Sequence, residues 1–157
     1  MKKIKNNSIY LWSIFLICIE QLSKIIIIKN LDKFPMQIIK SFIEFNYCEN
    51  RGVAFSIGSG NVVLFIVLNI ILICGLIFYY EKNKKDFNTF AKIAFTLTIS
   101  GGASNLLDRI FRGYVVDFID INNFISFPVF NIADIFIVSG IIGLMFFYIQ
   151  EIFKFKN

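Results

Sequence analysis

Residues 61–80 read NVVLFIVLNIILICGLIFYY, a run without a single charged side chain. A helix needs about 20 apolar residues, at about 1.5 Å per residue, to cross about 30 Å of hydrocarbon. This run therefore predicts a membrane-spanning helix, and it decides the fold class. The composition agrees, because 57% of the 157 residues are hydrophobic and the mean hydropathy is +0.69. Such a chain is more apolar than an ordinary soluble domain.

Three further apolar runs predict three more spans, at about 8–28, 90–107 and 132–153. Glu20 and Lys24 interrupt the first run, and their i,i+4 spacing lets each lower the cost of the other's charge. Bulky residues follow that run in place of a small-residue cleavage site, so we expect an uncleaved span. We therefore expect one all-α membrane domain of four transmembrane helices over residues 1–157.

Lysines are concentrated on one side of this topology. They are Lys2, Lys3, Lys5, Lys82, Lys84, Lys85, Lys92, Lys154 and Lys156. With three acidic residues they give that side a net charge of +6, whereas the rest of the chain is at −1. The positive-inside rule places both termini in the cytoplasm and the segments of about 29–60 and 108–131 outside. The overall charge of +5 is thus a topology signal, and we expect no nucleic-acid partner.

The two outer segments differ in composition from the spans. Residues 38–47 read IIKSFIEFNY and are rich in β-branched and aromatic side chains, which favours short strands. The second segment carries aromatic residues suited to the membrane interface, namely Tyr114, Phe118, Phe124 and Phe127.

The chain contains no histidine, which excludes a Ser-His-Asp triad, a Cys-His dyad and any histidine-ligated metal. Its three cysteines, Cys18, Cys48 and Cys74, match no zinc spacing and are expected to be small buried hydrophobes or free thiols. We expect neither a metal nor a cofactor.

Two carboxylates carry the functional hypothesis. Asp117 lies in the run GYVVDFI and Asp134 lies in FNIAD, where the last apolar run begins. A carboxylate near lipid is costly, so it is normally paired, hydrated or functional. Two that converge share one proton: the ionised group can activate water while the protonated group serves as the acid. This pattern predicts aspartic protease chemistry.

Other interpretations of the same residues remain open. Asn131 could cap the last helix, with Asp134 favouring its positive N-terminal dipole, and Asp117 could simply be exposed. The carboxylates could also serve as a proton relay in a small transporter, or as polar packing contacts in a structural membrane subunit.

Two further blocks lie at the same outer depth. In GGASNLLDR, residues 101–109, small residues allow close helix packing, and Asn105, Asp108 and Arg109 share one helix face. That face fits a structural polar cluster as well as catalysis, and Arg109 could pair with a carboxylate or a lipid phosphate. In NRGVAF, residues 50–55, Asn50 either forms a turn or holds a substrate backbone.

Four blocks together make the chain resemble the lipoprotein signal peptidases of bacteria, over nearly its whole length. They are Glu20-Gln21-Leu22-Ser23-Lys24; Asn50-Arg51-Gly52-Val53-Ala54-Phe55; the run from Gly101 to Arg109 continuing to Gly113-x-Val115-x-Asp117-Phe118; and Phe130-Asn131-x-Ala133-Asp134. The family usually carries aspartate where Glu20 stands, which puts the usual role of that position in doubt.

The resemblance implies that Asp117 and Asp134 are the catalytic dyad. It implies supporting roles for Glu20, Lys24, Asn50, Gly52, Gly102, Asn105, Arg109 and Asn131, with Asp108 chiefly structural. It further implies a β-rich outer cradle and a prolipoprotein substrate cleaved just before its diacylglyceryl-modified cysteine. The expected location is the bacterial inner membrane, in contact with lipid, as a monomer with its active site at the outer leaflet.

Overall fold

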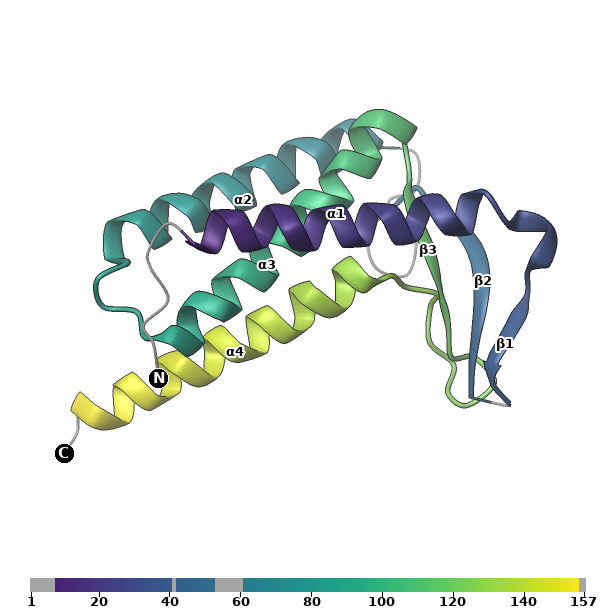
Figure 1. The fold of residues 1–157 in the computed structure, drawn as a ribbon. Coiled ribbons are helices and arrows are strands. Elements are labelled where there is room, and N and C mark those ends of the chain that lie inside the picture. The colour runs from purple at the N-terminus through teal and green to yellow at the C-terminus, as the bar shows by residue number, and fades with distance from the viewer. Residues whose placement is uncertain (1–7, 41, 53–60, 156–157) are drawn as a thin grey trace.

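The computed structural model describes residues 8–40, 42–52 and 61–155. Four long helices lie side by side, and a small sheet covers one end of them (Figure 1). The helices are α1 (Ser8–Ile28), α2 (Val62–Asn83), α3 (Thr89–Arg112) and α4 (Ile132–Phe155). All four apolar runs are therefore helical, and α1 has the limits that its sequence predicted. The lysines at positions 2, 3, 5 and 156 lie outside the described residues.

Three of these helices, α1, α2 and α4, are long and apolar enough to cross a membrane. The predicted span in α3 does not reach that apolarity within the described chain, because α3 packs against the other three helices and carries polar side chains inward. The other three helices direct large apolar side chains outward, including Trp12, Ile71 and Met145. Outward apolar surface of this extent is typical of a membrane protein.

Close packing between α3 and α4 depends on glycine residues, which have no Cβ atom. A Cβ atom at Gly101 would lie 2.3 Å from the Ala133 carbonyl oxygen, and one at Gly140 would lie 2.2 Å from Oγ1 of Thr98. The two helix backbones can approach this closely only where no Cβ intervenes. The small residues of the 101–109 block thus hold the first turn of α4, which carries Asp134, against α3.

Strands β1 (Met36–Ile39), β2 (Ile43–Asn50) and β3 (Val115–Asp120) form an antiparallel sheet in that order. The first two strands confirm the strand prediction in the first outer segment, and a short 3-10 helix (Leu31–Lys33) precedes them. The third strand was not predicted, because its segment was assigned only an interfacial role. It matters for function, since the pairing of Cys48 with Asp117 and of Asn50 with Val115 sets Asp117 beside β2.

The turn between α3 and β3 is short and sharply defined. Gly113 ends α3 with φ of 79°, a left-handed conformation that suits glycine, and its amide bonds the Arg109 carbonyl. The chain then enters β3 at Val115, so Asp117 lies close to the outer end of α3. Apolar contacts among Ile27, Val116 and Phe118 pack this strand onto the end of α1.

Candidate active site

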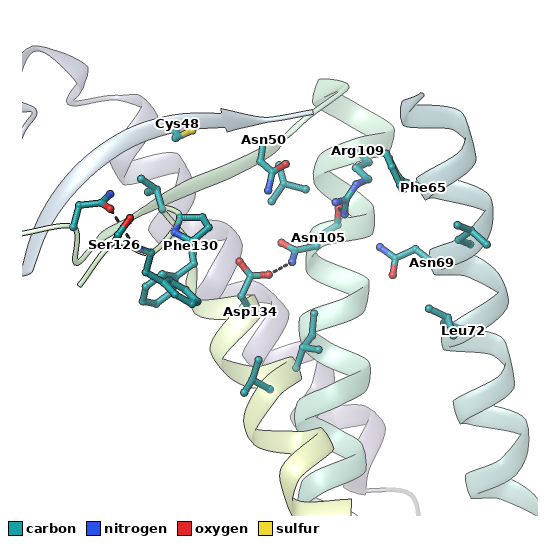
Figure 2. A pocket seen from close by; sticks show the side chains of 18 residues that line it. Cys48, Asn50, Phe65, Asn69, Leu72, Asn105, Arg109, Ser126, Phe130 and Asp134 are labelled. Carbon is teal, nitrogen blue, oxygen red and sulfur yellow. Dashed lines mark hydrogen bonds between the residues drawn. The ribbon is translucent and has the colours of Figure 1, made fainter. Parts of the chain in front are cut away.

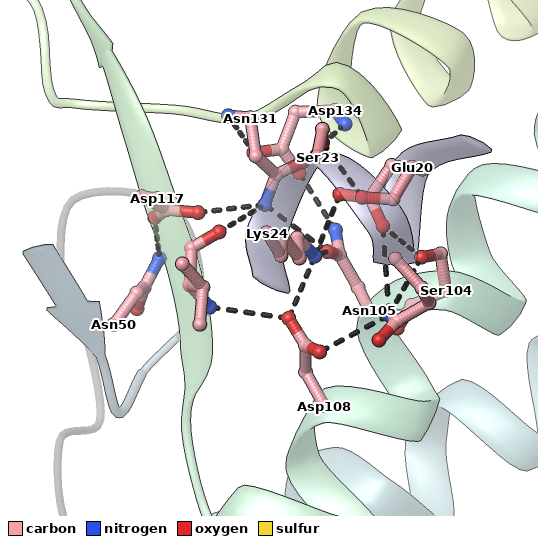
Figure 3. Close-up of polar contacts among 12 residues, drawn as sticks. Glu20, Ser23, Lys24, Asn50, Ser104, Asn105, Asp108, Asp117, Asn131 and Asp134 are labelled. Carbon is pink, nitrogen blue, oxygen red and sulfur yellow. Dashed lines mark hydrogen bonds and ion pairs between the residues drawn. The ribbon is translucent and has the colours of Figure 1, made fainter. Parts of the chain in front are cut away.

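A buried ion network joins α1 to α3. The Lys24 ammonium lies 2.8 Å from Glu20 Oε1 and 2.6 Å from Asp108 Oδ2, and all three side chains are fully buried. Asp108 also accepts from Arg112 and from the backbone amide of Val116, the latter at 3.1 Å. Two acidic and two basic groups therefore balance one another. Figure 3 shows Lys24 between Glu20 and Asp108, and the ion pair with Glu20 is the one that the i,i+4 spacing suggested.

Glu20 keeps this place despite its extra methylene relative to aspartate. Its carboxylate accepts from Ser104 of α3 as well as pairing with Lys24. Gln21 extends the network by donating to Asp108 Oδ1 at 3.1 Å. The Ser23 hydroxyl donates to the Glu20 carbonyl oxygen at 2.6 Å, a bond within its own helix rather than an arrangement with Lys24.

Asp117 lies beside this network and is only 1% exposed, so the alternative of an exposed Asp117 is wrong. Its carboxylate accepts from Nδ2 of Asn50 at 3.0 Å and from Nδ2 of Asn131 at 2.7 Å. Burial and the nearby charge of Asp134 raise the pKa of Asp117 to about 7, and the two amide donors offset only part of that effect. Asp117 can therefore hold a proton near neutral pH.

Asp134 forms the first turn of α4 together with Asn131, and it also faces Asp117. The Asn131 side chain accepts from the Asp134 amide at 2.9 Å, and Asp134 Oδ2 accepts from the Asn131 amide at 3.1 Å. This reciprocal arrangement is a capping box at the start of α4. The helix-cap interpretation is thus confirmed, and it does not compete with catalysis, because Asp134 Oδ1 still accepts from Asn105 at 2.8 Å.

Asn131 links the two aspartates. Its Nδ2 atom donates to Asp117, while its Oδ1 atom accepts from the Asp134 backbone. The side chain is fully buried, and it also approaches Oδ1 of Asn105 at 3.1 Å. The amide therefore fixes the relative positions of two carboxyl groups that come from a strand and from a helix.

A cavity of about 840 Å³ opens beside the pair, between α2, α4 and the segment before α4 (Figure 2). Its polar end is formed by Asn50, Asn105, Arg109 and Asp134, and its apolar wall includes Phe65, Leu72, Ile137 and Val138. Asp117 does not line the cavity, whereas its hydrogen-bond partner Asn50 does. The cavity is suited to a ligand with a polar centre and an apolar body.

Arg109 closes the polar end of the cavity. Its guanidinium donates to the Gly52 carbonyl oxygen at 2.9 Å and lies 6.0 Å from the centre of the Phe65 ring. It forms no ion pair with a carboxylate of the described chain, although it was expected to be able to do so. Gly52 in turn donates its amide to Asn50 Oδ1 at 3.0 Å, so Asn50 forms the predicted turn and both ends of its side chain are engaged.

The structure separates the remaining predicted residues by location. Gly102 faces Ile73 of α2 at ordinary contact distance rather than the aspartates, and Val53, Ala54 and Phe55 lie outside the described residues. Asp120, near Asp117 in sequence, instead accepts from Asn46 and Asn122 in the sheet. The three cysteines are free thiols, which confirms one of the two alternatives; the other, burial as small hydrophobic side chains, is wrong for Cys18 and Cys74, which are exposed on helices.

Some residues of the site were missed in the sequence. Arg112 pairs with Asp108, and its place one turn beyond that residue is the i,i+4 signal that could have identified it. Asn69 lines the cavity from the middle of α2. A lone amide in an otherwise apolar span is the available signal there.

Comparison with known proteins shows the family to which the chain is similar. A family model described as signal peptidase (SPase) II matches residues 12–150. The chain is similar to a lipoprotein signal peptidase of Clostridium novyi (strain NT), with 41% identity over 88% of this chain and 95% of that one. It is also similar to one of Staphylococcus aureus (strain Newman), with 32% identity over 96% and 93%.

Two solved structures share the fold. Both are described as bacterial membrane enzymes. One superposes with a TM-score of 0.84 and 30% identity over 96% of this chain and 92% of the other. The second gives a TM-score of 0.79 and 31% identity over 92% and 94%.

Proposed function

The chain belongs to the signal peptidase II family and removes signal peptides from prolipoproteins, and from this premise we propose that Asp117 and Asp134 are its catalytic pair. The observation that carries the proposal is the Asn131 bridge. One buried amide binds Asp117 through its nitrogen and the Asp134 backbone through its oxygen. Two carboxyl groups held this way, one keeping a proton near neutral pH, fit an aspartic endopeptidase.

The proposed reaction uses the two groups in opposite protonation states. Ionised Asp134 takes a proton from a water molecule, and the water oxygen attacks the scissile carbonyl carbon. Protonated Asp117 donates to the carbonyl oxygen, which gives a tetrahedral diol. The C–N bond then breaks as Asp134 gives its proton to the leaving amine, while ionised Asp117 takes a proton from a diol hydroxyl and the carbonyl of the new carboxyl group forms. The pair again holds one proton at the end of the cycle.

The proposed substrate is a prolipoprotein whose cysteine already carries diacylglycerol, cleaved just before that cysteine. The apolar wall of the cavity supports this choice, because it continues into a second apolar cavity of about 560 Å³ along α2 and α4. Leu72, Asn69 and Ile137 line both cavities. Acyl chains and an apolar signal peptide could remain in lipid-like surroundings while the peptide bond reaches Asp134.

We further propose that all four helices span the bacterial inner membrane with the site at its outer leaflet. The start of α1, the α2–α3 turn and the end of α4 lie at one end of the bundle, and the sheet lies at the other (Figure 1). Lys82, Lys84 and Lys85 occupy the first end, which is the cytoplasmic one by the positive-inside rule. The protein is proposed to act as a monomer in contact with lipid.

The test is prolipoprotein processing by purified protein and in cells that lack their own enzyme. Asp117→Asn and Asp134→Asn should each abolish processing, a loss of at least about 10³-fold, because each removes a group that exchanges a proton with substrate or water. Asp120→Asn is the matched control, since Asp120 bonds only within the outer segments. If Asp117→Asn or Asp134→Asn processes prolipoprotein at the rate of Asp120→Asn, the proposal is wrong.

A further inference from the structure

Three asparagine side chains point their Nδ2 atoms at the two aspartates, and each is held in that orientation by a donor on its Oδ1 atom (Figure 3). Asn50 and Asn131 donate to Asp117, and Asn105 donates to Asp134. An asparagine amide can rotate by half a turn and exchange its donor with its acceptor. The orientation must therefore be imposed by the groups that meet each oxygen.

For two of the three, the backbone imposes it. Asn50 Oδ1 accepts from the Gly52 amide at 3.0 Å, and Asn131 Oδ1 accepts from the Asp134 amide at 2.9 Å. A backbone amide can only donate, so neither side chain can rotate without losing this bond and turning its own NH₂ group toward the backbone donor.

For Asn105, a buried ammonium takes the place of the backbone amide. Lys24 Nζ lies 3.0 Å from Asn105 Oδ1, 2.8 Å from Glu20 and 2.6 Å from Asp108. An ammonium has donors and no acceptor, so it can only donate to Asn105, while its contacts with Glu20 and Asp108 are ion pairs. Asn131 Nδ2 also approaches Asn105 Oδ1, but it divides its two hydrogens among three acceptors and lies closest to Asp117.

We propose that Lys24 is a positioning residue for catalysis: its ammonium fixes the Asn105 amide so that Asn105 donates to Asp134 and keeps that carboxylate ionised. The proposal rests on the proposed role of Asp134 as the base. Glu20 and Asp108 serve this arrangement by holding the ammonium in place inside the bundle. Without Lys24, Asn105 can present its oxygen to Asp134, which favours the protonated, inactive base.

The charged surroundings of Asp134 come from each element packed against it. Arg109 of α3 and Lys24 of α1 favour its charge, and Asp117 of β3 opposes it. From β2, Cys48 faces Asp117. Lys24 acts on Asp134 through the hydrogen-bonded Asn105 side chain as well as through its charge, and Asp117 is linked to Asp134 in the same two ways through Asn131.

The test must separate orientation from the cost of an unpaired buried charge. In Lys24→Met/Glu20→Gln, one cation and one anion are removed together, while Asp108 keeps Arg112 and the Val116 amide. The control is Glu20→Gln alone, which leaves the Lys24–Asn105 bond intact. Both are purified, their thermal midpoints measured, and kcat and KM followed against pH with a diacylglyceryl-peptide substrate.

Relative to the control, the double variant should lose about 10- to 100-fold in kcat, the range typical when a residue that orients a reactive group is removed. KM should change less than about twofold, because Lys24 does not touch the cavity, and the acidic limb of the rate profile should move to higher pH. Equal kcat and an equal acidic limb in the two proteins would overturn the proposal. Inactive dyad variants beside such a result would leave the proposed function intact.

Wild-type protein offers a second measurement should the double variant fail to fold. Nuclear Overhauser contacts are expected between the Lys24 ammonium protons and the Asn105 side chain, and the Asn105 amide nitrogen should respond to the titration of Asp134. Absence of both signals would equally overturn the positioning role.

Discussion

Two buried polar clusters meet at the end of the helix bundle that the sheet covers, and they differ in how their charges are balanced. In the network of Glu20, Lys24, Asp108 and Arg112, each carboxylate has a cation within bonding distance. In the pair of Asp117 and Asp134, the groups within bonding distance are neutral amides. The first cluster is neutral and the second carries excess negative charge.

The difference supports the proposal that the first cluster stabilises the fold and that the second, here called the reactive pair, carries the chemistry. A neighbouring cation favours the ionised form of a carboxyl group and so opposes uptake of a proton, whereas two carboxylates held by amides compete for one proton. Asp108 accepts a hydrogen bond from the backbone amide of Val116, the residue before Asp117. The neutral network therefore also anchors β3, the strand that carries Asp117. The predictions below test this division, beginning with the largest effect.

Breaking the neutral network should reduce stability most. Asp108→Asn leaves Lys24 and Arg112 without their shared anion, and loss of one partner from a buried ion pair costs about 3–5 kcal/mol. Asp117→Asn replaces a carboxyl group that has no bonded cation and can hold a proton near neutral pH, so its loss of stability should be much smaller. Unfolding in detergent, followed by circular dichroism, compares the two. Similar losses for both variants would erase the distinction between the clusters.

A substitution that displaces Asp134 relative to Asp117 but leaves the ion network of Glu20, Lys24, Asp108 and Arg112 in place should reduce activity. In Gly101→Ala the new methyl group meets the Ala133 carbonyl and displaces the turn that carries Asp134. We expect a stability loss of about 1–3 kcal/mol and at least a tenfold loss of kcat. Gly75→Ala, where nothing lies within 4 Å, should change neither.

Gly140→Ala is a second control for the Gly101→Ala variant. It crowds the same helix pair against Thr98, away from Asp134. It should lose stability like Gly101→Ala but keep more of its kcat. If the two variants lose activity in proportion to their stability, packing alone explains both.

The pH dependence should report the reactive pair and not the network. Asp117 must hold a proton to act as the acid, and its pKa of about 7 means that the proton is present below that pH and lost above it. The value of kcat/KM should therefore fall tenfold per unit above about pH 7. Glu20→Gln should leave this basic limb in place, and a limb near pH 4 would contradict the assignment.

The smallest effect concerns Cys48, which lines the cavity and pairs with Asp117 across the strands. Burial and the charges of Asp117, Asp120 and Glu49 raise the pKa of the Cys48 thiol. Labelling by a permanently charged thiol reagent should be slow at neutral pH and a few-fold faster in Asp117→Asn.

Cys48→Ser identifies the labelled residue. Cys18 and Cys74 lie on the apolar helices α1 and α2, where a charged reagent should not reach them. Unchanged labelling in Cys48→Ser, or identical rates with and without Asp117, would place the thiol away from the reactive pair.

The helices were predictable from sequence because apolar runs and their ends report local structure. Strand β3 was missed because most of its residues are buried on both faces, so no alternation of polar and apolar residues marks it. The aromatic residues near Asp117 were assigned to the membrane interface, so no strand was predicted there, although Val115 and Val116 favour a strand.

The site was predicted as a set of residues but not as a set of bonds. The i,i+4 pair of Glu20 and Lys24 is visible in sequence, whereas the contact of Lys24 with Asn105 joins residues 81 positions apart. Which end of an amide faces a carboxylate depends on such distant contacts. Local patterns therefore could not distinguish a helix cap at Asn131 from a bridge between two carboxyl groups, and it is both.

The capping box at α4 limits how this protein can change under selection. Asp134 supplies the acceptor for the first turn of α4 and, in the proposed mechanism, also one carboxyl group of the catalytic pair. Serine or asparagine there could retain some capping but not proton transfer, and glutamate would move the carboxyl group. A compound that binds through the Asp134 carboxylate would thus contact a position with almost no route to a tolerated substitution, whereas contacts with Leu72 or Val138 would leave many.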